Sequence, residues 1–332
     1  MMDDEKIIVA LAADQNYLKG MLVTACSVAK HASECVTIVW VILDGGIRPN
    51  DLSALQRFIV RDHERSLFRV IKFDKSILNG VTLYNGSVMT YARLFLPKLL
   101  PDCNFVVYCD VDFLWRADIS ELWGLRDKKY AIQSVVDEHI HRLGSPEEER
   151  WCSMYNFKFD RKSYFCAGLC IFNLDKLRSG VVDHLIKVMH ECPNAPMADQ
   201  SIMNAILPKE DVGLLPARWQ RLVVELTEDK VVGPVVIHYA GIPPWKSENS
   251  KLMTDAMLAW YREYARVMGG GALHAMGNMH GLTFAFLSRM AFLFATGSRF
   301  TRWIFGCGMR LIGHEGYIEQ CVRLPGLLSC AS

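Results

Sequence analysis

Three residues of this 332-residue chain could together hold a divalent cation. Asp110 and Asp112 are two residues apart, so in an extended segment their carboxylates point to the same side. Such carboxylates repel each other unless a positive group lies between them, and Mg²⁺ and Mn²⁺ favour oxygen ligands, including phosphate oxygens. His238 ends a later apolar run, and its neutral imidazole could be a third ligand. The alternative is a solvated turn for the aspartates and a structural hydrogen bond for the histidine.

A strand is expected directly before the acidic pair. Residues 105–109 form a run of apolar and aromatic side chains, which places Asp110 at the carboxyl end of that strand. In open α/β sheets, ligands bind outside the carboxyl ends of the strands. The position therefore favours the metal interpretation over the solvated turn.

The N-terminal part alternates strand-like and helix-like segments. Strands are predicted at 7–11, 37–43 and 67–73, and helices at 17–30 and 51–61, with Asn50 as a candidate N-cap. This order is typical of an α/β fold, Rossmann-like, with a mostly parallel central sheet and flanking helices.

The middle of the chain continues this pattern with one interruption. Strands are predicted at 130–136, 168–173 and 235–239, and helices at 91–100, 175–191 and 198–207. Residues 138–162 are polar, contain Ser145-Pro146 and have no clear period. They are expected to form a long loop or irregular insert, a kind of segment that often has a function in α/β enzymes.

Charge and cysteine content exclude several classes of protein. A net charge of +1 provides no overall field for nucleic acid. The 11 cysteines are odd in number and contain no CxxC pair, unlike the disulfide framework of a secreted domain. Several are expected to be small core residues, namely Cys26, Cys35, Cys103, Cys109, Cys166 and Cys170. The N-terminus has no signal-peptide pattern, so a cytoplasmic location is expected.

Residues 269–332 differ from residues 1–268, which are expected to form the main domain. This tail has five arginines, no lysine and two glutamates, with aromatic residues between the arginines. Its most apolar part, 282–295, contains Arg289 and is shorter than the ~20 residues that span a membrane. Peripheral attachment in the membrane interface is expected. The alternative is a C-terminal helix that packs on the main domain.

Six short motifs, in the same order, give the chain a resemblance to glycosyltransferase family 8 from about residue 7 to residue 245. They are Ala12-Ala13-Asp14-Gln15-Asn16-Tyr17, Thr90-Tyr91-Ala92-Arg93-Leu94, Tyr108-Cys109-Asp110-Val111-Asp112, Tyr164 to Leu174, Asp199-Gln200, and His238-Tyr239-Ala240-Gly241 to Pro244-Trp245. The chain looks most like the bacterial lipooligosaccharide and lipopolysaccharide galactosyl- or glucosyltransferases of that family.

The resemblance implies a GT-A fold for residues 1–268 and a retaining transfer of a hexose. The implied donor is UDP-galactose or UDP-glucose, and the implied cofactor is Mn²⁺, with Mg²⁺ also possible. The implied acceptor is a saccharide, lipid-linked, of the lipopolysaccharide or lipooligosaccharide core. The reaction would then take place at the inner face of the cytoplasmic membrane.

The resemblance also implies roles for individual residues in donor binding. Asp110, Asp112 and His238 would ligate the metal, and Val111 and Gly241 belong to the same motifs. Ala12, Asp14, Asn16 and Tyr17 would hold the uridine, with Tyr17 stacked on the base. The alternative for this motif is an ordinary strand-to-helix turn with Asp14 as its cap.

A second group would act on the sugar. Arg93 and Asp199 would bind it, Ala167 and Gly168 would let the backbone approach it, and Gln200 would lie opposite the leaving group. Because an amide is a poor nucleophile, the implied reaction is a front-face substitution in which Gln200 stabilises an oxocarbenium-like transition state. The alternatives are a surface ion pair for Arg93 and a helix cap for Asp199.

The sequence departs from the family pattern at three places. Cys166 stands where the family commonly has Asn, and Ser201 where many relatives have Asp. The last motif is one residue shorter and has no lysine before Pro-Trp, although Lys246 could substitute. These changes motivate one alternative, a non-catalytic UDP-sugar- or saccharide-binding homologue. A sugar nucleotidyltransferase is disfavoured because no glycine-rich phosphate loop is found.

Overall fold

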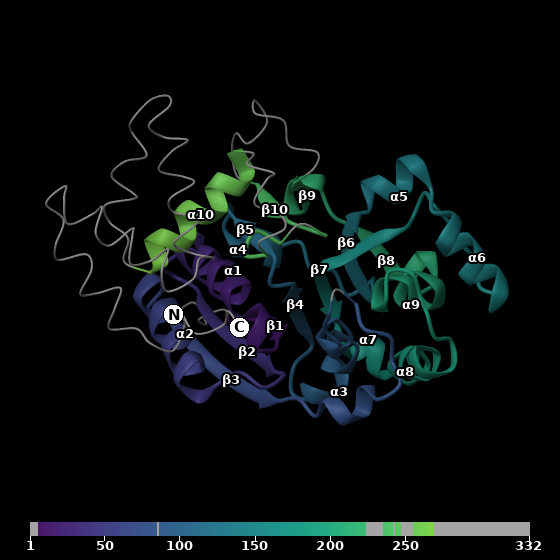
Figure 1. Cartoon of the computed structure of the whole chain (residues 1–332), viewed down its shortest axis with the longest axis horizontal. Coiled ribbons are helices and arrows are strands. Elements are labelled where there is room, and N and C mark those ends of the chain that lie inside the picture. Colours follow the sequence, from purple (N-terminus) through teal and green to yellow (C-terminus); the bar gives the residue numbers. More distant parts are fainter. Residues whose placement is uncertain (1–5, 85, 224–234, 242, 247–254, 269–332) are drawn as a thin grey trace, which may run out of the picture.

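The computed structural model describes residues 6–84, 86–223, 235–241, 243–246 and 255–268, arranged as in Figure 1. Its main element is a seven-stranded sheet of order β3-β2-β1-β4-β7-β6-β8. In that order the strands are Ser66–Lys72, Thr37–Asp44, Lys6–Ala13, Phe105–Cys109, Phe165–Asn173, Ile132–Val136 and Val212–Leu214. Within this sheet β7 runs antiparallel to β4 and β6, and the other pairs are parallel. The predicted mostly parallel sheet is confirmed.

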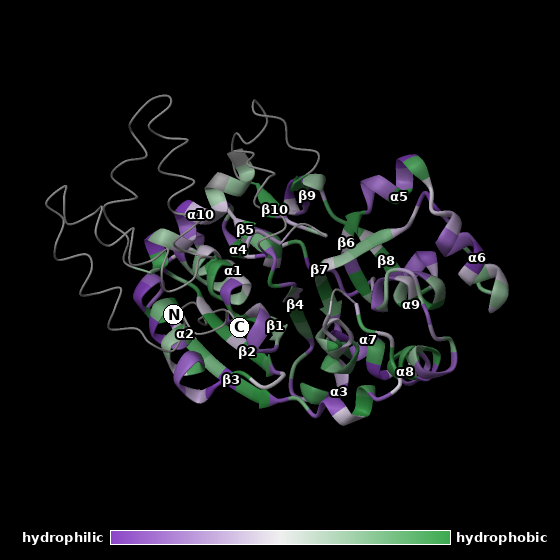
Figure 2. Cartoon of the chain, in the orientation of Figure 1, coloured by the Kyte–Doolittle hydropathy of each residue, from purple (hydrophilic) through white to green (hydrophobic). Residues whose placement is uncertain are grey.

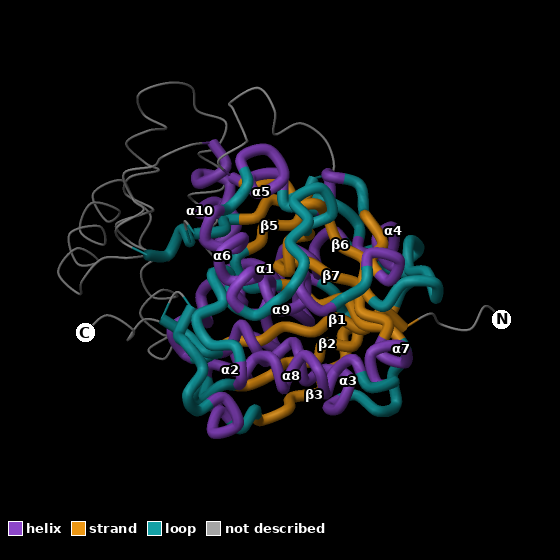
Figure 3. The backbone as a smooth tube through the Cα atoms, turned by 90° about the vertical axis from the view of Figure 1, so that its right-hand side faces the viewer, coloured by secondary structure: helices purple, strands orange, loops and turns teal. Residues whose placement is uncertain are grey.

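Apolar side chains fill both faces of the sheet, because successive residues of a strand point to opposite sides. Val9 and Leu11 of β1 pack under α1 (Leu18–His31), α2 (Pro49–Asp62) and α10 (Asp255–Val267). Ala10 and Ala12 face the opposite core. The helices that cover this second face include α3 (Leu96–Leu99), α7 (Leu174–Arg178), α8 (Val181–Glu191) and α9 (Asp199–Ile206), and Figure 3 shows α8 and α9 in front of the strands.

A second, three-stranded sheet follows the acidic pair. Its order is β5-β10-β9, with β5 at Phe113–Trp115, β10 at Val236–His238 and β9 at Arg221–Leu222. The helix α4 (Ile119–Trp123) comes directly after β5 in the chain. The antiparallel pairing of β10 with β5 puts His238 opposite Phe113. This register brings the histidine beside Asp112, the residue that precedes β5.

The segment 138–162, predicted to be irregular, contains two helices, α5 (Glu138–Leu143) and α6 (Pro146–Met154), so that prediction was wrong. The Ser145 hydroxyl accepts a hydrogen bond from the Glu148 amide, and Pro146 occupies the first turn, so Ser-Pro marks a helix start. Both helices carry mainly hydrophilic residues, as Figure 2 shows, which hides their period in the sequence.

Several other boundaries differ from the prediction. The cap of α2 is Arg48 rather than Asn50, and Gly180, at φ +104°, divides the expected helix 175–191 into α7 and α8. Residues Met89–Phe95 form a 3₁₀ helix that leads into α3. Of the cysteines expected in the core, Cys35 is exposed and Cys103 is half-buried.

The helix α10, which the pattern of the sequence did not predict, fixes the segment after His238. Its Trp260 ring lies 5.7 Å from the Trp245 ring. The hydroxyls of Tyr239 and Tyr261 donate to the carbonyls of Ala256 and Pro244, so two hydrogen bonds join α10 to this segment. The chain around His238 is therefore held against α10.

In the part of the chain that the structure describes, no helix is both long and apolar enough to cross a membrane. Residues 269–332, for which interfacial attachment is predicted, lie outside the described residues.

An ionic cluster joins α2 to α10. Asp62 accepts hydrogen bonds from Arg266 Nη2 at 2.5 Å and from Arg61 Nε at 3.1 Å. Burial raises the pKa of Asp62, but the hydrogen bonds from Arg266 and Arg61 outweigh burial and place the pKa below its ordinary value of 3.8. A carboxyl whose pKa is lowered by folding stabilises the fold above its unfolded pKa, and this stabilisation is lost as the pH falls through the folded pKa.

We predict that Asp62→Asn lowers the free energy of unfolding by about 2–3 kcal/mol at pH 7, because a buried carboxylate bonded to two arginines is lost. The difference from the wild type should shrink below about pH 4. Urea denaturation at several pH values measures it. The matched control is Asp183→Asn, which removes an exposed ion pair with Lys98 and should cost less than about 1 kcal/mol. Equal losses in the two variants would contradict the prediction.

Candidate active site

A cavity of about 680 Å³ opens at the carboxyl ends of β1 and β4, a volume in the usual range for small-molecule sites. The predicted site residues that line it are Ala12, Tyr17, Arg93, Asp110, Val111, Asp112, Ala167, Gly168, Asp199, Gln200, His238 and Gly241. Asp14, Asn16 and Lys246 are not among the lining residues. The structure therefore brings together most of the predicted site from segments far apart in the sequence.

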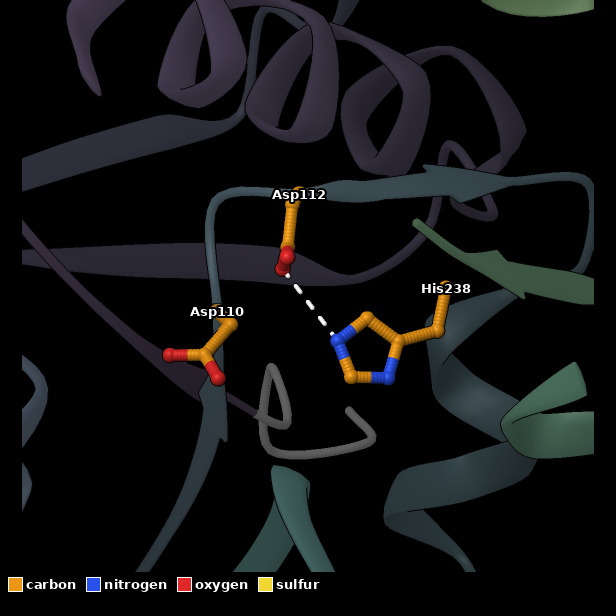
Figure 4. A group of neighbouring side chains, drawn as sticks. All are labelled: Asp110, Asp112 and His238. Atoms are coloured by element: carbon orange, nitrogen blue, oxygen red, sulfur yellow. Dashed lines mark ion pairs between the residues drawn. The ribbon is translucent and has the colours of Figure 1, made fainter. Parts of the chain in front are cut away.

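Asp110, Asp112 and His238 converge at one edge of this cavity (Figure 4). One ligand atom from each residue lies within 4.8 Å of the other two. Asp110 follows β4, Asp112 precedes β5 and His238 ends β10, so the cluster forms where the two sheets meet. Backbone hydrogen bonds from Asp110 to the Gly168 carbonyl and from Tyr239 to the Asp112 carbonyl fix this junction.

These side chains fit a hard divalent cation. Asp112 Oδ1 is buried and makes no hydrogen bond within the described residues, although it lies 3.3 Å from His238 Nε2. An ion pair without an aligned hydrogen bond leaves that oxygen able to ligate a metal. Two carboxylates and one imidazole are oxygen and nitrogen ligands that suit Mn²⁺ and also accommodate Mg²⁺. The cluster is therefore a candidate metal site.

Protonation of His238 competes with such an ion. Burial lowers the pKa of His238, but the Asp112 carboxylate outweighs burial and raises the pKa to about 10. At neutral pH the imidazole of the free site therefore carries protons on both nitrogens. A cation would have to displace the proton on Nε2, because a ligating imidazole is neutral.

The imidazole ring of His238 is packed on two sides. Phe113 stacks on it with 4.1 Å between ring centroids and 8° between planes. A Cβ added to Gly168 would lie 2.7 Å from His238 Cε1 and 3.1 Å from the Phe113 ring. The space beside Gly168, predicted to let the backbone approach a sugar, is thus occupied by these two rings.

Arg93 is a charged group of the site that is only 2% exposed. Its Nη2 donates to Asp110 Oδ1 at 2.7 Å, and its Nη1 donates to the Ala167 carbonyl. Its Nε lies 2.9 Å from Asp199 Oδ2 but directs its hydrogen to the Thr90 carbonyl, so the contact with Asp199 is an ion pair. The alternative of a surface ion pair for Arg93 is excluded.

The acidic groups beside Arg93 have perturbed pKa values. Burial raises the pKa of Asp199 to about 6, although Arg93 and a hydrogen bond from Thr90 oppose the rise. Burial also raises the pKa of Asp110, and Arg93 again opposes it. Because acids with perturbed pKa values in a cavity are typical of functional sites, these values support the assignment of this cavity.

The carboxamide of Gln200 is fixed on both sides. Its Oε1 accepts from the Ala167 amide at 2.9 Å, and its Nε2 donates to Asp137 Oδ2 at 3.1 Å. Asp199 is the first residue of α9 and Ala198 its N-cap, so the alternative of Asp199 as helix cap is wrong. The start of α9 instead presents both side chains to the cavity.

The motif predicted to hold the uridine has mixed roles. Asp14 caps the 3₁₀ turn Gln15–Tyr17 by accepting from the Asn16 amide, and its second oxygen accepts from the Ser87 hydroxyl. Asp14 therefore caps this turn, as the alternative interpretation expects, and its turn holds Tyr17 at the cavity, as the nucleotide-binding interpretation expects. Tyr17 lines the cavity, and Lys246 Nζ lies 5.9 Å from the centroid of its ring.

Some residues that shape the site were not predicted. Ser87, Asp137 and Gln220 each contact one of the predicted residues through a hydrogen bond from a distant segment. Gly20 of α1 leaves room for the Val111 carbonyl and Trp245, which a Cβ would meet at 2.5 and 2.4 Å. No motif marks such residues, because each depends on contacts formed only in the folded chain.

A ligand cavity at the carboxyl ends of a mostly parallel sheet defines an α/β protein of the nucleotide-binding type. The model of Glycosyl transferase family 8 matches residues 8–249. The chain therefore belongs to glycosyltransferase family 8, which implies a nucleotide-sugar donor and a saccharide acceptor. General stress protein A of Bacillus subtilis (strain 168) is 25% identical over 303 residues, 84% of this chain and 98% of that protein.

Two solved structures are similar in fold. The galactosyltransferase LgtC in complex with donor and acceptor sugar analogues has a TM-score of 0.64 at 21% identity, covering 85% of this chain and 100% of that one. The bifunctional glycosyltransferase WbbM has a TM-score of 0.65 at 21% identity, covering 80% of this chain and 50% of that one. At this identity the likeness establishes the GT-A fold.

We predict that Arg93→Met lowers the free energy of unfolding by about 3–5 kcal/mol, because the buried carboxylate of Asp199 and the half-buried carboxylate of Asp110 lose their counter-charge. Arg93→Lys should recover part of the loss, since it restores the charge without the planar fork. Urea denaturation at pH 7 measures both. The control is Arg69→Met, which removes an exposed pair with Asp102 and should cost less than about 1 kcal/mol. A loss in Arg93→Met no larger than in the control would refute the role of Arg93.

Proposed function

We propose that this protein is a retaining, metal-dependent glycosyltransferase that moves galactose or glucose from a UDP-sugar to a saccharide acceptor. The observation that carries this proposal is the Asp110–Asp112–His238 cluster, with the unbonded Asp112 Oδ1, at the edge of the large cavity. Membership of family 8 and the galactosyltransferase LgtC among the similar structures support the choice of sugar.

We propose that Asp110, Asp112 and His238 hold Mn²⁺, with Mg²⁺ as a substitute, next to the diphosphate of the donor. When bound, the ion offsets the negative charge of the diphosphate and acts as a Lewis acid on the departing UDP. Lys246 adds a positive charge near the ring of Tyr17, which lines the cavity. The family pattern has a lysine before Pro-Trp that this chain lacks. Lys246 is proposed to contact the diphosphate in its place.

The nucleoside is proposed to bind along Ala12 and Tyr17, which both line the cavity. Burial and the nearby Asp112 raise the pKa of Tyr17 to about 12, so its ring stays a neutral phenol at physiological pH. A neutral aromatic ring can stack on uracil. Asp14 and Asn16, which lie outside the lining, support this turn through the cap that the Asp14 side chain forms.

The hexose is proposed to lie between Asp199 and Gln200, beside Ala167. Arg93 is almost fully enclosed by protein, and its main part is to orient Asp110 and Asp199 toward the sugar. The carboxamide of Gln200 is held by two hydrogen bonds, so it presents a fixed dipole to the anomeric carbon. A fixed dipole can stabilise an oxocarbenium-like transition state without forming a covalent bond.

Retention then follows from attack on the leaving-group side. The acceptor hydroxyl forms the new glycosidic bond on the face from which UDP departs, and its proton passes to the departing phosphate. The wall formed by Ile140, Leu143 and Pro146 of α5 and α6 lines the cavity and is proposed to contact the acceptor. The acceptor is proposed to be lipid-linked, and residues 269–332 are proposed to attach the protein to the inner face of the cytoplasmic membrane.

We predict that EDTA abolishes UDP release from a panel of UDP-galactose, UDP-glucose, UDP-N-acetylglucosamine and UDP-glucuronate, and that Mn²⁺ restores release with one of the two hexose donors. Asp112→Asn should lower kcat/KM at least about 100-fold, because several kcal/mol of charge stabilisation are lost. The control Asp118→Asn weakens only the cap of α4, outside the cavity, and should retain activity.

Two outcomes would overturn this function. Metal-dependent UDP binding without turnover of any donor would favour the non-catalytic sugar-nucleotide-binding alternative. Turnover that persists in EDTA and in Asp112→Asn would exclude the proposed metal role. Calorimetric titration of UDP with and without Mn²⁺ distinguishes the first outcome from an unfolded or inactive preparation.

A further inference from the structure

The two nitrogens of the His238 ring face different surroundings. Nε2 is directed to Asp112, and the other nitrogen points away from both carboxylates (Figure 4). That nitrogen, Nδ1, lies 3.4 Å from the carboxamide nitrogen of Gln220 and 4.0 Å from Cys166 Sγ. Gln220 is 5% exposed and directly precedes β9, which pairs with β10.

The carboxamide of Gln220 has a second, unmatched atom. Among the residues that the structure describes, its buried Oε1 has no hydrogen-bond partner, whereas its Nε2 contacts Nδ1 of His238. A carboxamide can rotate by half a turn about its terminal bond, exchanging donor and acceptor in nearly the same volume. In the rotated position, Oε1 would accept a hydrogen from Nδ1, and the buried oxygen would gain its partner.

We infer that Gln220 is a positioning residue that fixes His238 in the form able to bind the metal. A proton on Nδ1, donated to Gln220 Oε1, leaves the lone pair of Nε2 free toward Asp112 and Asp110. In metal sites, such a hydrogen bond to the outer nitrogen orients the ring and strengthens its bond to the ion. This inference rests on the metal site proposed above.

Cys166 is the other neighbour of Nδ1, but it is the weaker candidate. A thiol is a poor acceptor, and its Sγ already lies at the 4.0 Å limit of a sulfur contact. The carboxamide of Gln220 lies closer, with its nitrogen 3.4 Å from Nδ1, and after the half-turn its oxygen is a full acceptor at that position. Phe113 and Gly168 leave the ring no room to turn toward a different partner.

The test is Mn²⁺ affinity of the full chain without donor, measured from the electron paramagnetic resonance signal of free Mn²⁺. Gln220→Met keeps the volume but removes the acceptor, and should raise the Kd about 10-fold or more. Gln220→Glu keeps an acceptor oxygen and should bind Mn²⁺ at least as tightly as the wild type. The matched control is Gln133→Met, another buried glutamine, which bonds to Leu125 and Asp127 outside the cavity and should leave the Kd unchanged.

A second measurement keeps the inference testable if Gln220→Met does not fold. Nitrogen-15 NMR of the histidine rings in the wild type loaded with Zn²⁺, with His238→Ala for assignment, should show Nδ1 of His238 protonated. A folded Gln220→Met with the wild-type Kd would overturn the role of Gln220 alone, whereas protonated Nε2 would also remove His238 from the proposed ligands. Wild-type Mn²⁺ affinity that Asp112→Asn leaves unchanged would overturn the proposed metal site and this inference together.

Discussion

A single buried guanidinium sets the electrostatics of this protein. Arg93 lies between Asp110, at the end of β4, and Asp199, at the start of α9, and its ion pairs with them measure 2.7 and 2.9 Å. Without that positive charge, the buried carboxylate of Asp199 and the half-buried carboxylate of Asp110 would repel each other at a large cost. The stacking of Arg93 on Tyr108, at 4.4 Å, and its bond to the Ala167 carbonyl hold it in place. One charge thereby joins β4, β7 and α9 around the cavity.

The second constraint is the junction between the two sheets. The pairing of β10 with β5 places His238 over Phe113, and the glycine at 168 leaves the space that both rings occupy. The helix α10 secures this arrangement from outside through Tyr239, Trp245 and Trp260. The helix lies beyond the residues that the family model matches, 8–249, yet it packs against the segment that carries the histidine.

Much of the fold could be predicted, because local patterns specify it. The alternation of apolar runs indicated β1 to β4 and their helices to within a few residues. The prediction failed where the signal was short or mixed. The polar helices α5 and α6 were expected to be irregular, Gly180 divided an expected helix, and the antiparallel direction of β7 has no local signature.

The sequence by itself determined the type of each main element and which residue types could bind a cation and a sugar nucleotide. It did so because helix and strand periods, and motifs such as Asp110-Val111-Asp112, are properties of neighbouring residues. The tertiary structure decided which side chains meet. The orphaned oxygen of Asp112, the burial of Arg93 and the approach of Gln220 to His238 all arise between segments far apart in the chain. Such contacts depend on strand register and on close packing, which no local pattern encodes.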